Sequence, residues 1–128
     1  MSMPLADLKV ETQGAIVIAR VRGDIDMSNA GELRKELGKN TPNDALGLVL
    51  DLSAVEYLDS AGIHMIHHLR EDLRVGGQKL ALVIPEASPI NATLRLAGLD
   101  WRDDTAETAE AARQALEAGS HREINGCR

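Results

Sequence analysis

The sequence predicts a single α/β domain in which a mixed, mostly parallel β-sheet with an N-terminal hairpin is flanked by about four helices. Two observations lead to this fold class. Strand-like and helix-like apolar patterns alternate from Ala15 onward, with connections long enough to cross between parallel strands. The length of 128 residues suits one compact domain, whose core must come from aliphatic residues because the chain has one Trp, one Tyr and no Phe.

The first two predicted strands form the hairpin. The segment AIVIARVRG, from Ala15 to Gly23, is rich in β-branched residues and alternates after its first residues, which is typical of a strand. The weaker segment LADLKVET precedes it, and Gly14 lies between the two. With so short a connection, the two strands should pair with each other.

A helix is predicted over NAGELRKELG, with Ser28 as its N-cap. Its apolar residues Ala30, Leu33 and Leu37 share one face, and Gly38 is the expected end. The next strand is LGLVLDL, from Leu46 to Leu52, which alternates too little to have one face in water. We expect it to be a central strand that is buried on both faces.

The longest helix is predicted to begin at Ser60 and to end at the pair Gly76 and Gly77. One broad apolar face is formed by Ala61, Met65, Ile66, Leu69 and Leu73. A further strand, KLALVIP, follows and ends at Pro85. Ser88 then supplies an N-cap before Pro89, which suits the first position of a helix.

The last part of the chain predicts two helices and a tail. The helix after Pro89 carries Leu94 and Leu96 and should end at Gly98, after which Trp101 is expected to cover the edge of the core. An alanine-rich helix should open at Thr105 and stop at Gly119. The segment HREINGCR has little apolar content, so we divide the chain into a domain over residues 1–118 and a flexible C-terminal tail over residues 119–128.

Composition bounds the possible functions. The net charge of -6 and the few aromatic residues argue against a nucleic-acid partner, since phosphate binding needs a concentrated basic face. The single cysteine, Cys127, cannot form an internal disulfide, which suits a reducing compartment. No segment has the length and apolarity of a membrane span, and the first residues do not read as a secretory signal. We expect a cytoplasmic protein without a membrane partner.

The stretch LDSAGI places Asp59 and Ser60 where a buried strand passes to a helix. One interpretation is that either side chain simply caps the helix. Another is that Ser60 is a functional hydroxyl, because open α/β sheets usually carry their sites at the carboxyl ends of the strands. A phosphate on Ser60 would lie where the helix end stabilises an anion, without unfolding the domain.

A catalytic role is a weaker interpretation of the same residues. The G-x-S-x-G nucleophile motif is absent, since Leu58 stands where it requires glycine. A small hydrolase or transferase that uses Ser60 or Asp59 is therefore an alternative of a different class. Our expectation is that the chain is not an enzyme and needs no cofactor.

Two further clusters contain residues that can carry chemistry. GDIDMS ends a strand that we expect beside the central one, so Asp24 and Asp26 either form an acidic rim near Ser60 or are ordinary solvated loop residues. His64, His67 and His68 have a helical spacing that can bind a transition metal, but no HExxH motif is present. A solvated helix face is the better interpretation of the histidines, with a metal sensor as an alternative.

The stretch VLDLSAVEYLDSAGIHMI resembles the signature of anti-sigma factor antagonists, the stand-alone members of the STAS domain family. GDID is similar to the family's G-x-(L/I/V)-D element, and SPINATLRLAGLD is similar to its segment ending in a glycine-leucine pair. The similarity runs from about Val17 to Leu116 and implies a mixed sheet with surrounding helices. It departs at Ala61, where many relatives carry a second serine, and in a SPINATLRL segment about one residue shorter than usual.

The resemblance implies a partner-switching mechanism in the stress response and in transcription regulation. The unphosphorylated protein would bind an anti-sigma factor serine kinase and so release a sigma factor. The kinase, which holds ATP and Mg²⁺, would phosphorylate Ser60, and a serine phosphatase would reverse the reaction. By this resemblance the partner-binding residues are expected to be Gly23, Asp24, Asp26, Asp59, Ser60, Ala61, Gly62 and Ile63. A close alternative is a STAS scaffold subunit of a stressosome or of a lipid-transport complex.

Overall fold

One mixed sheet forms the centre of the molecule. The computed structural model describes residues 2–3, 6–97 and 105–126, and the side chains of residues 6–97 and 105–118. The strands are β1 (Ser2–Met3), β2 (Ala6–Gln13), β3 (Ile16–Ile25), β4 (Gly47–Leu58), β5 (Lys79–Val83) and β6 (Thr105–Ala106), in the spatial order β1-β2-β3-β4-β5-β6. The pairs β1–β2 and β2–β3 are antiparallel and the other three are parallel. The mixed, mostly parallel sheet is as predicted, whereas the short strands β1 and β6 were not predicted.

The N-terminal hairpin is confirmed. Strands β2 and β3 pair without interruption from Ala6 opposite Gly23 to Gln13 opposite Ile16. Between them, Gly14 has a φ of 62°, in the left-handed region where a side chain is strained. The glycine therefore permits the tight turn that starts β3 beside β2.

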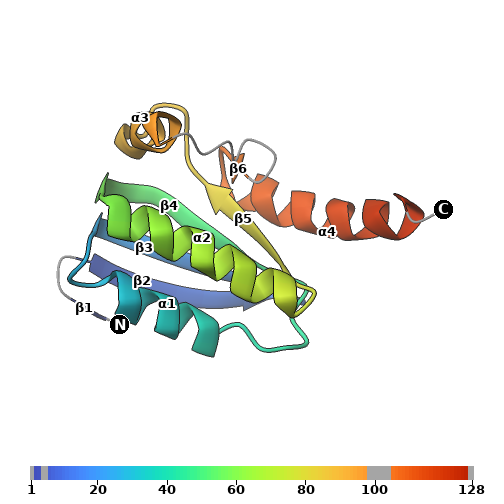
Figure 1. The fold of residues 1–128 in the computed structure, drawn as a ribbon. Helices are drawn as coiled ribbons and strands as arrows, with labels where there is room; N and C mark the ends of the chain where they lie inside the picture. The colour runs from blue at the N-terminus through green and yellow to red at the C-terminus, as the bar shows by residue number, and fades with distance from the viewer. Residues whose placement is uncertain (1, 4–5, 98–104, 127–128) are drawn as a thin grey trace.

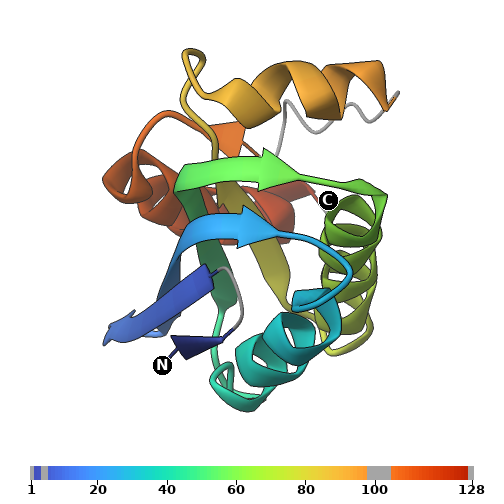
Figure 2. The ribbon, with the colours of Figure 1, turned by 90° about the vertical axis from the view of Figure 1, so that its left-hand side faces the viewer.

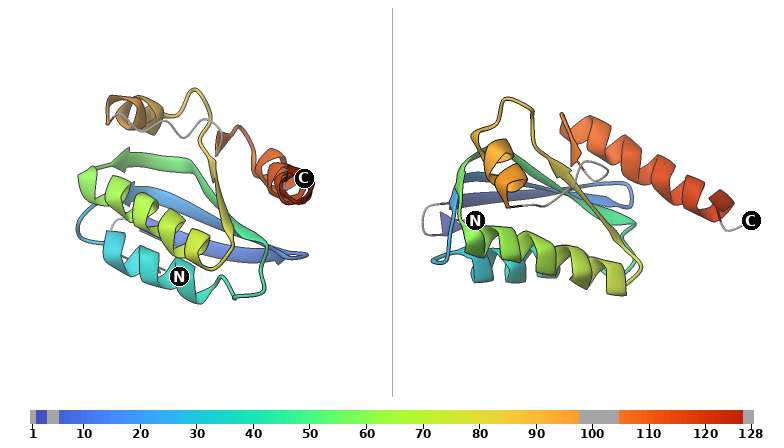
Figure 3. Two further views of the ribbon diagram at one scale, coloured as in Figure 1. Left: turned by 45° about the vertical axis from the view of Figure 1, so that its right-hand side comes forward. Right: turned by 45° about the horizontal axis from the view of Figure 1, so that its top comes forward.

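Four helices flank this sheet in the described part of the chain. Helices α1 (Ala30–Lys39) and α2 (Ser60–Val75) lie side by side on one face, while α4 (Ala109–Gly126) lies on the other (Figures 1 and 2). Helix α3 (Pro89–Leu96) packs near the carboxyl end of β4 (Figure 3). None of the helices in the described ranges is both long and apolar enough to cross a membrane.

Strand β4 is buried on both faces at its start. Its residues Leu48 and Leu50 belong to the larger hydrophobic cluster, which includes Leu33 of α1 and Ile66 of α2. Val49 belongs to a smaller cluster on the opposite face, below α4. The predicted central strand is thus confirmed, with each face of the sheet closed by helices.

An ion pair joins the two helices on the larger face. The Arg34 guanidinium of α1 donates two hydrogen bonds of 2.9 Å to the Asp72 carboxylate of α2. These bonds lower the pKa of Asp72 below its ordinary value. Both side chains remain well exposed, so the ion pair links α1 to α2 but adds little to the free energy of unfolding.

Several predicted helix ends are confirmed and others are wrong. Helix α2 ends at Gly76 and Gly77, and Ser88 caps α3 by accepting a hydrogen bond from the Ile90 amide, both as predicted. The N-cap of α1 is Asn29, not Ser28, because the Asp26 carboxylate binds the Ser28 amide and hydroxyl. Helix α1 also continues past Gly38 to Lys39.

The predicted helix that carries Leu94 and Leu96 is confirmed as α3. Leu94 is buried, whereas Leu96 is 89% exposed. Helix α3 ends at Leu96 with Ala97 as its C-cap. The predicted stop at Gly98 and the predicted position of Trp101 lie outside the described residues.

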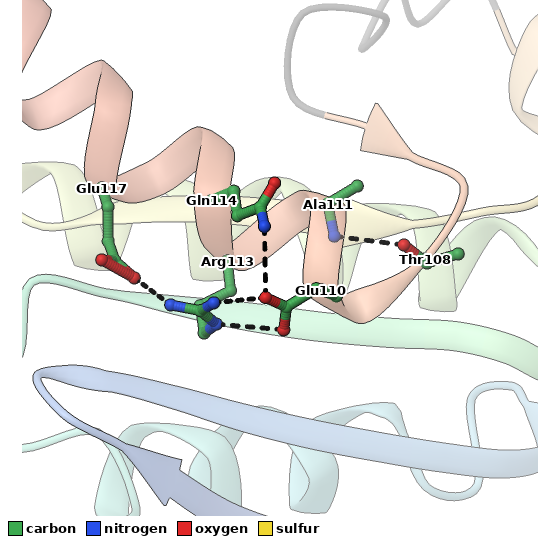
Figure 4. A network of polar contacts seen from close by, with 6 residues as sticks. All are labelled: Thr108, Glu110, Ala111, Arg113, Gln114 and Glu117. Atoms are coloured by element: carbon green, nitrogen blue, oxygen red, sulfur yellow. Dashed lines mark hydrogen bonds and ion pairs between the residues drawn. The ribbon is translucent and has the colours of Figure 1, made fainter.

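The predicted start of the last helix at Thr105 is wrong. Thr105 and Ala106 form the short edge strand β6, and the Thr108 hydroxyl accepts a hydrogen bond of 3.1 Å from the Ala111 amide at the start of α4. Figure 4 shows this cap and the exposed network in which Arg113 bridges Glu110 and Glu117. Ion pairs between side chains one turn apart stabilise a helix. They matter here because the alanine side chains of α4 are small and bury little apolar area.

The predicted end of this helix at Gly119 is also wrong, since α4 continues to Gly126. A single glycine weakens a helix by only about 1 kcal/mol and does not have to end it. The division into a domain over residues 1–118 and a flexible tail over residues 119–128 remains a prediction.

Replacing Leu116 with Ala should lower the free energy of unfolding by about 2–3 kcal/mol. Helix α4 enters the smaller cluster mainly through Ala112 and Leu116, and Leu116 is only 5% exposed. Urea unfolding followed by circular dichroism measures the change. Leu96→Ala is the matched control and should change the free energy by less than about 0.5 kcal/mol. Equal effects of the two variants would contradict this account of α4 packing.

Candidate functional site

The candidate site lies at the carboxyl ends of β3 and β4. Strand β4 continues six residues beyond the predicted end at Leu52, to Leu58. Two register shifts against β3 each leave an extra residue in β4, so that Arg22 pairs with Ala54 and Asp24 with Tyr57. The buried positions Leu52, Val55 and Leu58 are therefore spaced by three instead of two. This extension places Leu58 beside Ile25.

Asp59 is the N-cap of α2 and also holds the neighbouring loop. Its carboxylate accepts a hydrogen bond of 3.0 Å from the Gly62 amide and one of 3.3 Å from the Met27 amide. Its own amide donates to the Ile25 carbonyl over 3.2 Å. The capping interpretation of LDSAGI therefore applies to Asp59. Ser60 does not cap the helix.

Ser60 is the first residue of α2 and is exposed. Within the described residues, its hydroxyl has no hydrogen-bond partner, and the amides of Ser60 and Ala61 have no acceptor. These two amides lie at the positive end of the helix dipole. The serine therefore presents a free hydroxyl at a position where an added anion would be stabilised by its own helix.

The segment from Gly23 to Ser28 lies beside the start of α2, because the Met27 amide and the Ile25 carbonyl both bind Asp59. Gly23 has a φ of 104° at the second register shift, a conformation that L side chains rarely adopt. Asp24 and Asp26 are both partly exposed. Because Asp59 binds the Met27 amide, the loop that carries Asp24 and Asp26 is held next to the start of α2. An acidic rim around Ser60 remains a prediction.

Asn29, which the sequence analysis did not single out, organises this loop. It is 1% exposed, its side-chain oxygen accepts from the Asp26 amide over 3.1 Å, and its side-chain nitrogen donates to the Asp24 carbonyl over 2.9 Å. The sequence analysis named Ser28 as the cap, whereas Asn29 occupies that position in the structure. A buried amide at this place satisfies two backbone groups at once, which a serine hydroxyl is too short to reach.

Ala61, Gly62 and Ile63 follow Ser60 in the first turn. Gly62 is buried, and a Cβ atom at this position would lie 2.5 Å from Leu58 Cδ1 and 3.1 Å from the Ile25 carbonyl oxygen. The glycine thus lets α2 approach the ends of β3 and β4 closely. Ala61 and Ile63 are partly buried against the larger cluster, which leaves part of each at the surface. Their contact with a partner remains a prediction.

Two exposed apolar side chains near the site were also missed. Met27 is 83% exposed and Tyr57 is 53% exposed, although both belong to the segments that carry Asp26 and Asp59. Tyr57 is the cross-strand neighbour of Asp24. Isolated exposed apolar residues are common, but here both accompany the acidic groups around Ser60. The surface is therefore apolar and negatively charged together.

The three histidines of α2 are all exposed, in agreement with a solvated helix face. The rings of His67 and His68 lie 6.2 Å apart, edge to face. Across the described residues, no group of three or more His, Cys, Asp or Glu side chains is arranged to hold a metal ion.

Replacing Asp59 with Ala should lower the free energy of unfolding by about 1–2 kcal/mol, because the cap and the hydrogen bond to the Met27 amide are lost together. Asp59→Asn should retain most of the stability, since asparagine is an equally good N-cap. Chemical unfolding of the three proteins tests this. If Asp59→Asn lost as much stability as Asp59→Ala, charge and not capping geometry would be the important property.

Comparison with known proteins places this geometry in context. The model of the STAS domain family matches residues 7–112. The anti-sigma-F factor antagonist RsfB of Mycobacterium tuberculosis is 29% identical over 92 residues, which cover 71% of this chain and 73% of RsfB.

Solved structures agree with this match. An anti-sigma factor antagonist from Mycobacterium paratuberculosis is 28% identical, with a TM-score of 0.76 over 91% of this chain and 99% of that one. The anti-sigma factor antagonist SpoIIAA in its unphosphorylated form is 14% identical, with a TM-score of 0.69 over 88% of this chain and 97% of that one, and shows a common fold.

Proposed function

This chain belongs to the STAS domain family, and on that premise we propose that it is an anti-sigma factor antagonist controlled by phosphorylation of Ser60. In its unphosphorylated form it binds an anti-sigma factor that is a serine kinase, and a sigma factor is released. The observation that carries the proposal is the exposed, unpartnered Ser60 hydroxyl at the first position of α2, directly after the Asp59 cap.

The position of Ser60 explains how a phosphate is accepted without refolding. Phosphorylation adds about 1.5 to 2 negative charges and three acceptor oxygens. The amides of Ser60 and Ala61 have no acceptor within the described residues, and the helix dipole favours an anion here. Asp59 keeps its hydrogen bond to the Gly62 amide, so the first turn of α2 stays capped.

The same position explains how the phosphate prevents binding. A partner that covers Ser60 also covers Asp24, Asp26 and Asp59, and the phosphate adds to a surface that is already negative. The phosphate also needs space and water that a closed interface removes. A loss of about 3 kcal/mol of binding free energy weakens association about a hundredfold. The switch therefore requires no conformational change in the protein itself.

In this mechanism the protein is the substrate of two other enzymes. The kinase partner holds ATP and Mg²⁺ and transfers the γ-phosphoryl group to the Ser60 hydroxyl, and a serine phosphatase removes it. The acidic groups around Ser60 favour a partner surface with basic residues, and the exposed side chains of Met27 and Tyr57 suit apolar contacts in the same interface. A cytoplasmic location follows from partners that control transcription.

The test is capture of native partners with the purified full chain, followed by addition of Mg-ATP. We expect an anti-sigma factor kinase among the captured proteins, release of that kinase with ATP, and a single phosphate on Ser60 in peptide mass spectra. The Ser60→Ala protein is the control and should keep the kinase bound. If the kinase bound but Ser60 stayed unmodified, the switch would be wrong and a scaffold function would be favoured.

A further inference from the structure

Helix α4 covers only part of its face of the sheet. Its main contacts are with β4, β5 and β6, and it shares the smaller cluster with Ile16 and Ile18 in the first part of β3. Helix α4 lies over the β5 side of the sheet, away from the hairpin of β2 and β3 (Figure 2). A cavity of about 540 Å³ opens over β2, β3 and the bulged part of β4. Six polar residues line it: Asp7, Lys9, Arg20, Arg22, Asp51 and Ser53. Its volume lies within the usual range for small-molecule sites.

Three cations gather in this cavity, although the whole chain has a net charge of -6. Lys9 lies directly opposite Arg20 on the neighbouring strand, and Arg22 is two residues further along the same strand. Asp7 stands opposite Arg22, so the lining carries three cations and two carboxylates. An anion that lies between Lys9 and Arg22 would be attracted by both side chains.

Only one of the three cations is neutralised. The Arg20 guanidinium donates a hydrogen bond of 2.6 Å to the Glu11 carboxylate and lies 3.7 Å from the Asp51 carboxylate. The side chains of Lys9 and Arg22 form no ion pair or hydrogen bond with the part of the chain that the structure describes. These two basic side chains, on neighbouring strands, are therefore available to bind a ligand.

The first bulge of β4 adds a neutral donor. Two residues of β4, Leu52 and Ser53, stand opposite Val21 alone, and the Asp51 carboxylate accepts the Ser53 amide over 2.9 Å. The Ser53 hydroxyl has no partner among the described residues and lies in the lining of the cavity. Bulges commonly redirect a side chain toward a site. Here the redirected group is a hydroxyl beside two free cations.

We propose that this cavity binds a small soluble phosphate monoester. Lys9, Arg22 and the Ser53 hydroxyl bind the phosphate oxygens, because charge-assisted hydrogen bonds from Arg and Lys suit a dianion. The Asp51 carboxylate accepts a hydrogen bond from a hydroxyl group on the body of the ester. The cavity exceeds the size of one phosphate ion, so the ester body is part of what is recognised. This site goes beyond the proposed function and does not involve Ser60.

The experiment is titration of the ¹⁵N-labelled full chain with glycerol 2-phosphate at low ionic strength, followed by amide chemical shifts. We expect saturable shifts in β2, β3 and residues 51–54, with inorganic phosphate binding at least about threefold more weakly. Arg22→Gln should raise the Kd about tenfold, equivalent to about 1.4 kcal/mol. Arg95→Gln on α3 is the matched control, because Arg95 is exposed and outside the cavity, and it should leave the Kd unchanged.

Three results would overturn the proposal. The first is the absence of saturable shifts, and the second is an equal effect of Arg22→Gln and Arg95→Gln, which would indicate nonspecific attraction. The third is a set of shifts centred on Ser60 and Ala61, which would assign the anion to the start of α2. If inorganic phosphate bound with the same Kd as glycerol 2-phosphate, recognition of the ester body would be wrong. Ser60→Ala should bind the probe normally, so failure here is separable from failure of the switch.

Discussion

Phosphorylation of Ser60 is expected to weaken binding of the anti-sigma factor about a hundredfold, and Ser60→Asp about tenfold, while Ser60→Ala keeps the affinity of the unmodified protein. The expected loss of affinity increases with the negative charge added at position 60. Aspartate adds one negative charge beside Asp24, Asp26 and Asp59, and phosphate adds nearly two. Alanine removes only a hydroxyl that has no partner among the described residues. Isothermal titration calorimetry with the purified anti-sigma factor gives the three dissociation constants.

The control for added charge is Ala115→Glu. Ala115 is exposed on α4, on the opposite side of the sheet from α2 (Figure 2). This variant should change the affinity less than about twofold, since a charge at this distance is screened. Equal affinities of Ser60→Ala and Ser60→Asp would contradict the switch. A loss of affinity with Ala115→Glu as large as with Ser60→Asp would indicate general repulsion instead of a local effect.

Replacing Gly47 with Ala is expected to lower the free energy of unfolding by about 3 kcal/mol. Gly47 begins the central strand β4 and pairs with Ile16 on one side and Lys79 on the other. A Cβ atom here would lie 2.5 Å from the Lys79 carbonyl oxygen and 3.3 Å from Leu116 Cδ1. The oxygen belongs to the backbone of β5, so relief requires movement of a strand and not of a flexible side chain.

Gly38→Ala is the matched control for this substitution. A Cβ atom at Gly38 would meet nothing within 4 Å, and alanine favours the helix that contains it, so this variant should gain up to about 1 kcal/mol. Urea unfolding of both variants and the parent protein measures the difference in sign. A loss of less than about 1 kcal/mol for Gly47→Ala would show that β4 and β5 can separate at this point at little cost.

Local patterns predicted much of the fold. The alternation of AIVIARVRG, the uninterrupted apolar run from Leu46 to Leu52 and the apolar face of α2 each identified an element of the correct type. They succeed because burial against a sheet or a helix leaves a period in the sequence. The position of Asp59 and Ser60 between a buried strand and a helix was likewise predicted from the LDSAGI stretch.

The errors occur where tertiary contacts override the local period. Strand β4 was predicted to cover only the apolar run that ends at Leu52, and only pairing with β3 shows that the strand continues to Leu58 with bulges that absorb the extra residues. Thr105 was assigned to a helix because an alanine-rich segment follows, whereas pairing with Leu82 makes it an edge strand. Gly119 has the residue type of a helix end, but α4 continues through it.

The order and type of most elements, the buried central strand and the placement of Asp59 and Ser60 at its carboxyl end could thus be predicted from the amino-acid pattern. The choice of Asp59 as the cap, the free Ser60 hydroxyl and the role of Asn29 in the adjoining loop became visible only in the folded chain. Burial and periodicity depend on neighbours in the chain, whereas the choice among several side chains able to accept one amide hydrogen bond depends on which of them the folded backbone brings within reach.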